Sequence, residues 1–365
     1  MNKFQFIYAI AFVLVTAVGC TKDEGIDDDL SFLNSASSSN VTNSFTISND
    51  NSGMVKITPN GQGVTSYAVK FGDATGGVDF QNIKPGESAT HAYPEGTYTV
   101  TITAYDIAGK ATTSTHPLTV TYRAPENVAI KVEGDVKVSA TADFAKSFLV
   151  YYGDVPNETG TPLAIGQVLP PHIYPAGGPY ELKIVALSGG VAKTTVTKTL
   201  FGFPLTFESP TMNYFFGTFG DVNFTKVANP FPGGLNTSAN VGRYTKPAGV
   251  PSWSGTYSPM DIPINMAHGK KVKVLIYNPS VANIGKRLNV ELEAQVAGTG
   301  ATANGVAVLK APITTSGAWE ELTFDFSTIA AIGGTARYGQ LVLRFNDNAA
   351  GAGEVIYIDN IRITN

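Results

Sequence analysis

The sequence predicts an all-β protein made of several β-sandwiches. The chain contains 38 Gly, 21 Pro, 16 Tyr and 20 Phe. These residue types favour turns and strands over helices. No segment keeps apolar residues at the 3.6-residue spacing of a helix for more than a turn or two. With 365 residues the chain is long enough for two or three domains, each with its own core.

The charge balance excludes one class of partner. Only 15% of residues are charged, and the formal net charge is −4. A nucleic-acid-binding protein carries a basic stripe or patch, and this sequence has none.

The first twenty residues have the pattern of an export signal. A short positive start at residues 1–3 precedes an apolar run, residues 4–18, that is too short to span a bilayer. Small residues then lead directly into Cys20. This pattern resembles a bacterial lipoprotein signal, which implies that Cys20 becomes the acylated first residue. A signal peptide in which Cys20 is incidental remains the alternative. Acylation of Cys20, the only cysteine, would leave no thiol for a disulfide.

Residues 21–43 are predicted to form a tether. Residues 21–29 are acidic, and residues 31–43 are rich in Ser and Asn. Acidic residues directly after the lipidated cysteine resemble the surface-export signal of Bacteroidetes lipoproteins. That resemblance implies a lipid-anchored protein exposed on the outer membrane. A simple solvated linker has the same composition.

Two segments of the chain repeat each other. Residues 71–73 (Phe-Gly-Asp) return 81 residues later as residues 152–154 (Tyr-Gly-Asp). At the same offset, residues 91–94 (His-Ala-Tyr-Pro) return as residues 172–175 (His-Ile-Tyr-Pro). An alternating apolar–polar segment follows each His-x-Tyr-Pro, as expected for half-buried strands. Two units of this length with short strands are predicted to be small β-sandwiches.

These motifs resemble PKD domains, which are immunoglobulin-like sandwiches. The resemblance covers residues 44–122 as domain 1 and residues 123–200 as domain 2. It implies that His91 and His172 are structural and hydrogen-bond within the fold. A metal-binding or catalytic role for the two histidines is the alternative.

Residues 201–365 are predicted to form a third, larger β-sandwich. The domain opens at residues 205–208 and closes with the alternating segment 355–363. Between them the sequence predicts strands near residues 221–228, 239–245, 256–264, 270–278, 287–296, 305–312, 319–326 and 339–346.

One stretch of this domain combines turn residues, a short alternating strand and aromatic residues. It comprises residues 229–244 and continues to residues 253–257. Together with the opening Phe-Glu and the closing Tyr-Ile-Asp-Asn-Ile, it resembles the jelly-roll carbohydrate-binding modules of Bacteroidetes surface glycan-binding lipoproteins and laminarinases. The resemblance implies non-catalytic capture of a polysaccharide, with a β-glucan such as laminarin as the expected ligand. A neighbouring outer-membrane importer or hydrolase would receive it.

The same resemblance implies a structural calcium ion between the first and last strands. Glu208 and Asp359 occupy the matching positions. Calcium prefers six to eight hard oxygen ligands, so two carboxylates together with carbonyl groups suit it. Alternatively, both carboxylates face solvent or cap turns.

Of the two tryptophans, Trp253 is predicted to be the platform for a sugar ring. It lies among Pro, Ser and Gly residues that leave its ring accessible, and Tyr257 follows it closely. Trp319 begins an alternating strand and is predicted to be buried in the core. The alternative for Trp253 is that its ring only holds its own loop in place.

Strand alternation supplies the polar candidates. In residues 288–293 the apolar residues face the core, so Glu291 and Glu293 face outward. The same rule places Arg344 and Asn346 outward in residues 340–346, and Tyr277 outward in residues 272–277. If these strands are neighbours, the side chains form one surface, although ordinary solvated strand faces have the same pattern. The predicted ligand-binding residues are Trp253, Tyr257, Tyr277, Glu291, Glu293, Arg344 and Asn346.

Two other function classes are weighed against glycan binding. Glu291 and Glu293 are a carboxylate pair, and paired carboxylates catalyse glycoside hydrolysis. However, no further acidic residue lies in this strand, and the sequence lacks the motif of a catalytic triad, a histidine metal site or a phosphate loop. We therefore predict a protein that is not an enzyme. A structural or adhesive surface protein is the second alternative.

Overall fold

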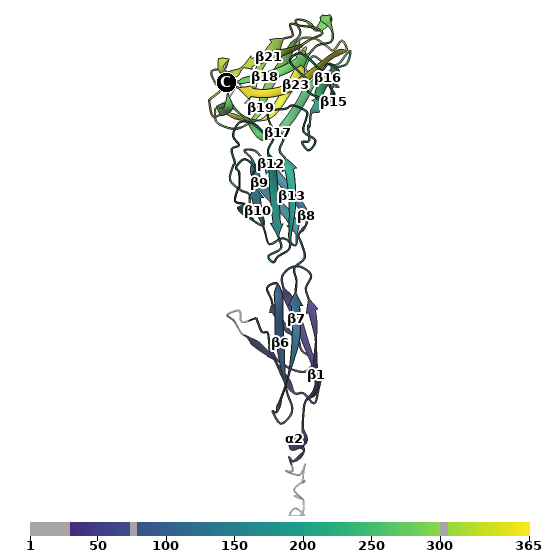
Figure 1. Cartoon of the computed structure of the whole chain (residues 1–365), viewed down its shortest axis with the longest axis vertical. Coiled ribbons are helices and arrows are strands. Elements are labelled where there is room, and N and C mark those ends of the chain that lie inside the picture. The colour runs from purple at the N-terminus through teal and green to yellow at the C-terminus, as the bar shows by residue number, and fades with distance from the viewer. Residues whose placement is uncertain (1–29, 74–78, 300–305) are drawn as a thin grey trace, which may run out of the picture. The chain divides into compact units, whose positions relative to one another are not determined.

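The computed structural model describes residues 30–73, 79–299 and 306–365 (Figure 1). The predicted signal peptide, Cys20 and residues 21–29 of the predicted tether lie outside these residues. The chain divides into two compact units, residues 1–121 and 122–365. Nearly all regular structure is β, so the predicted fold class is confirmed. In the described part of the chain, no helix has the length and apolar character needed to cross a membrane.

The first unit contains one short helix, α2 (Phe32–Ser35), and a small antiparallel sandwich. Its three-stranded sheet has the order β1 (Ser39–Ile47), β2 (Met54–Gln62) and β5 (Ala89–Ala92). Its four-stranded sheet has the order β4 (Phe80–Ile83), β3 (Ser66–Lys70), β6 (Gly96–Tyr105) and β7 (Ala111–Val120). The predicted tether ran to residue 43, but α2 and the start of β1 already lie within it. The alternation of this Ser/Asn-rich segment was too weak to indicate a strand.

The second unit begins with another small sandwich. A two-stranded sheet pairs β8 (Glu126–Glu133) with β9 (Lys137–Asp143). A four-stranded sheet has the order β11 (Thr161–Ala164), β10 (Ser147–Tyr151), β12 (Glu181–Leu187) and β13 (Lys193–Thr199). The alternation predicted for β12 is visible in its burial, because Leu182, Ile184 and Ala186 are fully buried.

Both repeated histidines hydrogen-bond within their own sandwich. His91 Nε2 lies 2.7 Å from an oxygen of Asp73, and the imidazole stacks on Phe71 with ring centroids 4.1 Å apart. His172 repeats this geometry at 2.9 Å from Asp154. Because an imidazole ring held in this way packs and bonds inside the sandwich, both histidines have the structural role that was expected.

The C-terminal sandwich consists of two five-stranded antiparallel sheets. We call the first the front sheet; its order is β14 (Gly217–Phe219), β17 (Gly255–Asn265), β22 (Arg337–Phe345), β19 (Arg287–Ala297) and β20 (Ala307–Pro312). We call the second the back sheet; its order is β15 (Asn223–Ala228), β16 (Asn240–Lys246), β23 (Glu354–Thr364), β18 (Lys271–Tyr277) and β21 (Trp319–Asp325). Short 3₁₀ helices are η1 (Met266–His268), η2 (Val281–Asn283) and η4 (Phe326–Thr328).

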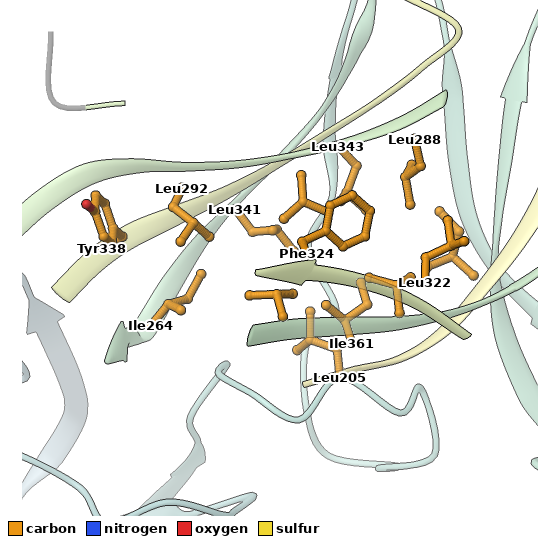
Figure 2. Packing of buried hydrophobic residues seen from close by; sticks show 14 of the residues in the cluster. Leu205, Ile264, Leu288, Leu292, Leu322, Phe324, Tyr338, Leu341, Leu343 and Ile361 are labelled. Atoms are coloured by element: carbon orange, nitrogen blue, oxygen red, sulfur yellow. The ribbon is translucent and has the colours of Figure 1, made fainter. Parts of the chain in front are cut away.

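The core lies between these two sheets (Figure 2). Leu288 and Leu292 of β19 and Leu341 and Leu343 of β22 point into it from the front sheet. Phe324 of β21 packs against them from the back sheet. Each buried side chain of this size stabilises the fold by about 1.5–3 kcal/mol. This core fixes which side chains of each strand face outward.

The opening segment and the last strand lie side by side at one point. Leu205 and Ile361 form an isolated bridge, with N···O distances of 2.8 and 3.0 Å. The eight predicted internal strands correspond to β15 to β22 within two residues at each end. The three-residue strand β14 was not predicted, because three residues are too few to show alternation.

The second sandwich and the C-terminal sandwich contact each other within the second unit. The guanidinium of Arg337 donates to both carboxylate oxygens of Asp135, with N···O distances of 2.7 and 2.5 Å. Lys198 lies 2.6 Å from Asp261, which also accepts from the backbone N–H of Phe201 at 3.0 Å. A bidentate Arg–carboxylate pair has a fixed relative geometry, so these contacts orient one sandwich on the other.

Candidate functional site

The outer face of the front sheet brings together several of the predicted residues. Since Leu288, Val290 and Leu292 of β19 face the core, the alternate residues Glu291 and Glu293 face outward. In the register of the sheet, Glu291 lies opposite Val342 and Glu293 lies opposite Gln340. The prediction that Glu291 and Glu293 share a face with β22 is therefore correct.

Arg344 and Glu291 form an ion pair on this face. Nε of Arg344 donates to Oε1 of Glu291 at 2.5 Å. Glu291 is only 3% exposed. Burial raises the pKa of the Glu291 carboxyl, and the guanidinium of Arg344 opposes that rise. The pair presents the remaining N–H groups of a fixed arginine at the surface of the sheet.

Two further polar pairs extend the face. Gln340 Nε2 donates to Oε2 of Glu293 at 2.7 Å. Lys310 of β20 forms an ion pair with Asp347. Carboxylates, amides and ammonium groups of this kind form directional hydrogen bonds with hydroxyl groups.

Aromatic rings lie along the β14 and β17 side of the same sheet. Trp253 is 55% exposed, and its ring is parallel to that of Phe219 within 2°, with centroids 6.3 Å apart. Gly255 lies between Phe219 and Arg344: a Cβ there would come within 2.7 Å of the Phe219 ring and 2.5 Å of Arg344 Cγ. Glycine at this position allows the aromatic residue and the arginine to pack close together.

A second aromatic pair continues this side of the face. Tyr257 lies opposite Val342 of β22 and therefore points outward with it. The edge of the Phe215 ring meets Tyr257 at 74°, with centroids 6.0 Å apart, and Phe215 is 47% exposed. Exposed apolar surface of this extent, next to polar side chains, is typical of a ligand-binding face.

Tyr277 does not join this face. It lies on β18 in the back sheet, where its ring stacks on Phe231 at a centroid distance of 4.0 Å. Alternation correctly indicated that Tyr277 points outward, but β18 and β19 are consecutive strands in different sheets. The prediction that Tyr277 shares one surface with Glu291 and Arg344 is wrong for this reason.

The stretch 229–244 and the stretch 253–257 also lie on different sheets of the sandwich. Residues 229–239 of the first stretch lie over the outer face of the back sheet, where the carbonyl of Phe231 accepts a hydrogen bond from the Trp319 indole at 2.8 Å, and residues 240–244 form part of β16 in that sheet. The second lies on the front sheet. Trp319 is buried as predicted, but in a small cluster with Val241 and Leu275 outside the main core.

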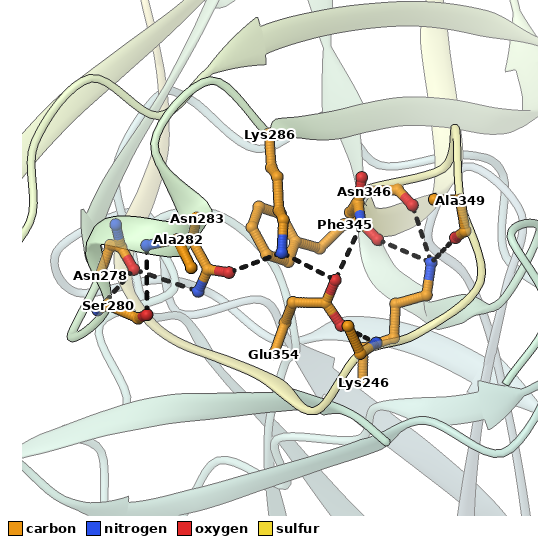
Figure 3. A network of polar contacts seen from close by, with 11 residues as sticks. Lys246, Asn278, Ser280, Ala282, Asn283, Lys286, Phe345, Asn346, Ala349 and Glu354 are labelled. Atoms are coloured by element: carbon orange, nitrogen blue, oxygen red, sulfur yellow. Dashed lines mark hydrogen bonds and ion pairs between the residues drawn. The ribbon is translucent and has the colours of Figure 1, made fainter. Parts of the chain in front are cut away.

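Asn346 belongs to a buried polar network beyond the end of β22 (Figure 3). It is only 8% exposed, and its side-chain amide donates to Glu354 at 2.8 Å. The ammonium group of the fully buried Lys246 donates to the carbonyls of residues 345, 346 and 349 at 3.2, 2.8 and 3.0 Å. Asn346 has a φ of 52°, so the strand alternation ends before it. Its predicted place on the outward face is therefore wrong.

Glu208 and Asp359 lie near each other beside the stretch 229–244. Asp359 is buried and accepts hydrogen bonds from Asn236 Nδ2 at 2.8 Å and from the Ser238 hydroxyl. Glu208 accepts from the backbone N–H of Asn240 at 2.6 Å. Burial raises the pKa of the Asp359 carboxyl, and the nearby charge of Glu208 adds to this.

The oxygen-rich surroundings fit a calcium ion in chemical type. All four carboxylate oxygens of Glu208 and Asp359 already accept hydrogen bonds from protein donors. Among the described residues, no three His, Cys, Asp or Glu side chains are close enough together to hold a metal ion.

Sequence reasoning missed Phe215 and Phe219. Phe215 is the middle of three consecutive aromatic residues outside any strand, so apolar–polar alternation does not mark it as outward. Phe219 had no signal either, since β14 is only three residues long.

No family model matches the sequence, and no curated protein matches it. The solved structures that resemble the chain include carbohydrate-binding modules and glycan-binding SGBP-B proteins. SGBP-B from a xyloglucan utilization locus of Bacteroides uniformis is 11% identical, with 88% of this chain and 98% of that chain covered and a TM-score of 0.30. The family 11 carbohydrate-binding module of Clostridium thermocellum is also 11% identical, with 44% of this chain and 97% of that chain covered and a TM-score of 0.29.

Proposed function

We propose that the C-terminal sandwich binds an extended polysaccharide on the outer face of the front sheet, without catalysing its cleavage. The observation that carries this proposal is the half-exposed ring of Trp253, parallel to that of Phe219, which in turn lies across Gly255 from Arg344 of the Arg344–Glu291 pair. A flat apolar ring next to fixed hydrogen-bonding groups suits a sugar, which has both apolar faces and hydroxyl groups.

The outer face of a sheet contacts a sugar chain from one side, so each sugar unit loses only part of its contact with water on binding. We therefore expect modest affinity for one chain and stronger retention where many copies of the protein share a surface. Arg344 and Gln340 are held by Glu291 and Glu293, so little side-chain entropy is lost when they bind hydroxyl groups.

Replacement of Trp253 tests the proposal. We expect the chain from residue 21 onward to be retarded in affinity electrophoresis by one soluble polysaccharide of a panel. Trp253→Ala should weaken binding more than tenfold, which corresponds to about 1.4 kcal/mol or more. Leu235→Ala is the matched control, because Leu235 is 62% exposed in the same sandwich but on the stretch that covers the back sheet.

One outcome of this experiment supports the proposed site and another refutes glycan capture. Retardation that Trp253→Ala abolishes and Leu235→Ala preserves supports the proposed site. If every glycan of the panel leaves the wild-type chain unretarded, the capture function is wrong, and a protein partner for this face becomes the hypothesis to test.

We also propose the class of glycan that is bound and the place in the cell where the protein lies. On the sequence resemblance alone, we infer a β-glucan such as laminarin as the ligand and a lipid anchor at Cys20 on the outer surface of the outer membrane. The protein would then hand its glycan to a neighbouring uptake system. Metabolic labelling with a radioactive fatty acid tests the anchor: the label should enter the wild-type protein, whereas labelling of Cys20→Ala would refute lipidation at this residue.

We also propose that a calcium ion binds between Glu208 and Asp359. The charge of Glu208 and the burial of Asp359 both disfavour the ionised form of Asp359. A cation between the two carboxylates would offset the repulsion and the loss of hydration. Calcium at a hundredfold excess over its Kd should then stabilise the fold by about 2.7 kcal/mol. Thermal unfolding with calcium and with a chelator measures this. Asp359→Asn should abolish the difference, and equal midpoints in the wild type would refute the site.

A further inference from the structure

A polar cleft lies where the second sandwich meets the C-terminal sandwich. Its volume is about 450 Å³. One wall comes from the second sandwich, with Glu181 of β12 and Thr197 and Thr199 of β13. The other wall comes from the C-terminal sandwich and includes Phe215 and Pro259. The proposed glycan site, as described so far, contains no residue of the second sandwich.

This cleft is continuous with the face that carries Trp253. The outward row of β17 runs from Gly255 through Tyr257 to Pro259, which lies opposite Gln340 of β22. Residues two apart on a strand are about 6.6 Å apart, so this row is the direct path from the aromatic rings to the cleft. Phe215 belongs to both regions, because its ring meets Tyr257 and also lines the cleft.

The base of the cleft is held by contacts between the two sandwiches. Asp261 of β17 lies 2.6 Å from the ammonium group of Lys198 and accepts the backbone N–H of Phe201 at 3.0 Å. The backbone N–H of Ile262 in turn donates to the carbonyl of Phe201 at 3.0 Å. Because these contacts already order the walls of the cleft, little conformational entropy is lost when a ligand binds there.

The walls offer the groups that recognise a sugar. The hydroxyls of Thr197 and Thr199 both donate and accept hydrogen bonds, and the carboxylate of Glu181 accepts them. Thr199 donates to the hydroxyl of Thr211 at 2.7 Å and keeps lone pairs for a further donor. Phe215 adds an exposed apolar face beside these polar groups.

We propose that the second sandwich contributes a binding subsite for the same polysaccharide. A chain lying over Trp253 and Tyr257 continues along β17 into the cleft, where Glu181 and Thr197 bind its hydroxyl groups. The second sandwich is then part of the binding site together with the C-terminal sandwich. This inference rests on the proposed function and specifies the ligand further: a chain several sugar units longer than the Trp253 face alone can hold.

Calorimetric titration of the chain from residue 21 onward with oligosaccharides of increasing length tests the inference. The oligosaccharides are taken from whichever glycan retains the wild type. Thr197→Arg fills the cleft from an exposed position of β13, where a longer side chain does not disturb the core. Thr195→Arg is the matched control, because Thr195 is exposed on the same face of β13 but does not line the cleft. Glu181→Ala is a second variant, which removes the carboxylate without adding bulk.

For the wild type, affinity should rise as the oligosaccharide outgrows the Trp253 face. Thr197→Arg should remove this gain, about fivefold for the longest oligosaccharide, and leave the shortest binding ligand unaffected. Glu181→Ala should remove part of it, and Thr195→Arg none. If Thr197→Arg and Glu181→Ala bind long oligosaccharides as the wild type does, the subsite is refuted while glycan binding stands. If the wild type binds no glycan, the proposed function fails first and the subsite with it.

Discussion

The two outer faces of the C-terminal sandwich each carry one of the two tryptophans, and the exposure of the tryptophan side chain differs between them. On the front sheet, Trp253 is 55% exposed beside Phe219. On the back sheet, Trp319 is 8% exposed, packs with Val241 and Leu275, and donates its indole N–H to the carbonyl of Phe231. The same residue type is therefore left open on one face and covered on the other.

The difference lies in the stretch 229–240. It folds over the back sheet and is fixed there by the Trp319 indole and by hydrogen bonds from Asn236 and Ser238 to Asp359. Aromatic side chains that serve stability are covered by the chain itself, because burial of their area lowers the free energy of the folded state. The front face has exposed aromatic area at Trp253 and Phe215 without such a cover, as the proposed glycan site requires.

The largest effect that this comparison predicts is on stability. Trp319→Ala should lower the free energy of unfolding by about 3–5 kcal/mol, because it leaves a cavity beside Val241 and Leu275 and removes an indole donor. Trp253→Ala should cost less than about 1 kcal/mol, since its ring is already half in water. Denaturant unfolding followed by the fluorescence of the remaining tryptophan measures both, because each variant keeps one tryptophan in this sandwich.

The two substitutions should also differ in binding. Trp319→Ala, at a denaturant concentration where it is still folded, should retain the glycan that Trp253→Ala loses. Equal loss of stability in both variants would mean that Trp253 holds its loop in place, and the contrast between the two faces would fail.

Strand alternation was sufficient to predict one part of the candidate site. It correctly gave the outward direction of Glu291, Glu293 and Arg344, because each lies within a long strand whose other face carries core residues. The exposure of Trp253 was predicted by a different signal, the small residues around it.

Alternation does not determine which strands are neighbours, because sheet order depends on contacts between residues distant in the sequence. For this reason Tyr277 was placed with Glu291, although β18 and β19 belong to different sheets. Asn346 was misplaced because a left-handed residue ends the alternation at the end of β22. The cleft between the sandwiches was not predictable either, since it needs the packing of two separate domains.

The two faces also differ in how burial and hydrogen bonds affect their carboxyl groups. Burial raises the pKa of Glu291 above its ordinary 4.5, against the opposing effect of Arg344. Burial acts in the same direction on Glu321 of the back sheet, but hydrogen bonds from Lys273 and Arg362 outweigh it and lower the pKa of Glu321 below 4.5. The two carboxyls should therefore titrate on opposite sides of the ordinary value.

The smallest predicted effect is the resulting pH dependence of stability. The contribution of Glu291 to stability is fully present below pH 4.5 and is lost as the pH rises through its raised folded pKa. The wild type should therefore lose stability relative to Glu291→Gln over that window.

The contribution of Glu321 to stability is present above pH 4.5 and is lost as the pH falls through its lowered folded pKa. The wild type should therefore lose stability relative to Glu321→Gln on acidification. Denaturant unfolding at a series of pH values, followed by tryptophan fluorescence, gives both slopes. Slopes of the same sign for the two variants would show that Glu291 is not desolvated, and the front face would then be as open to water at its ion pair as it is at Trp253.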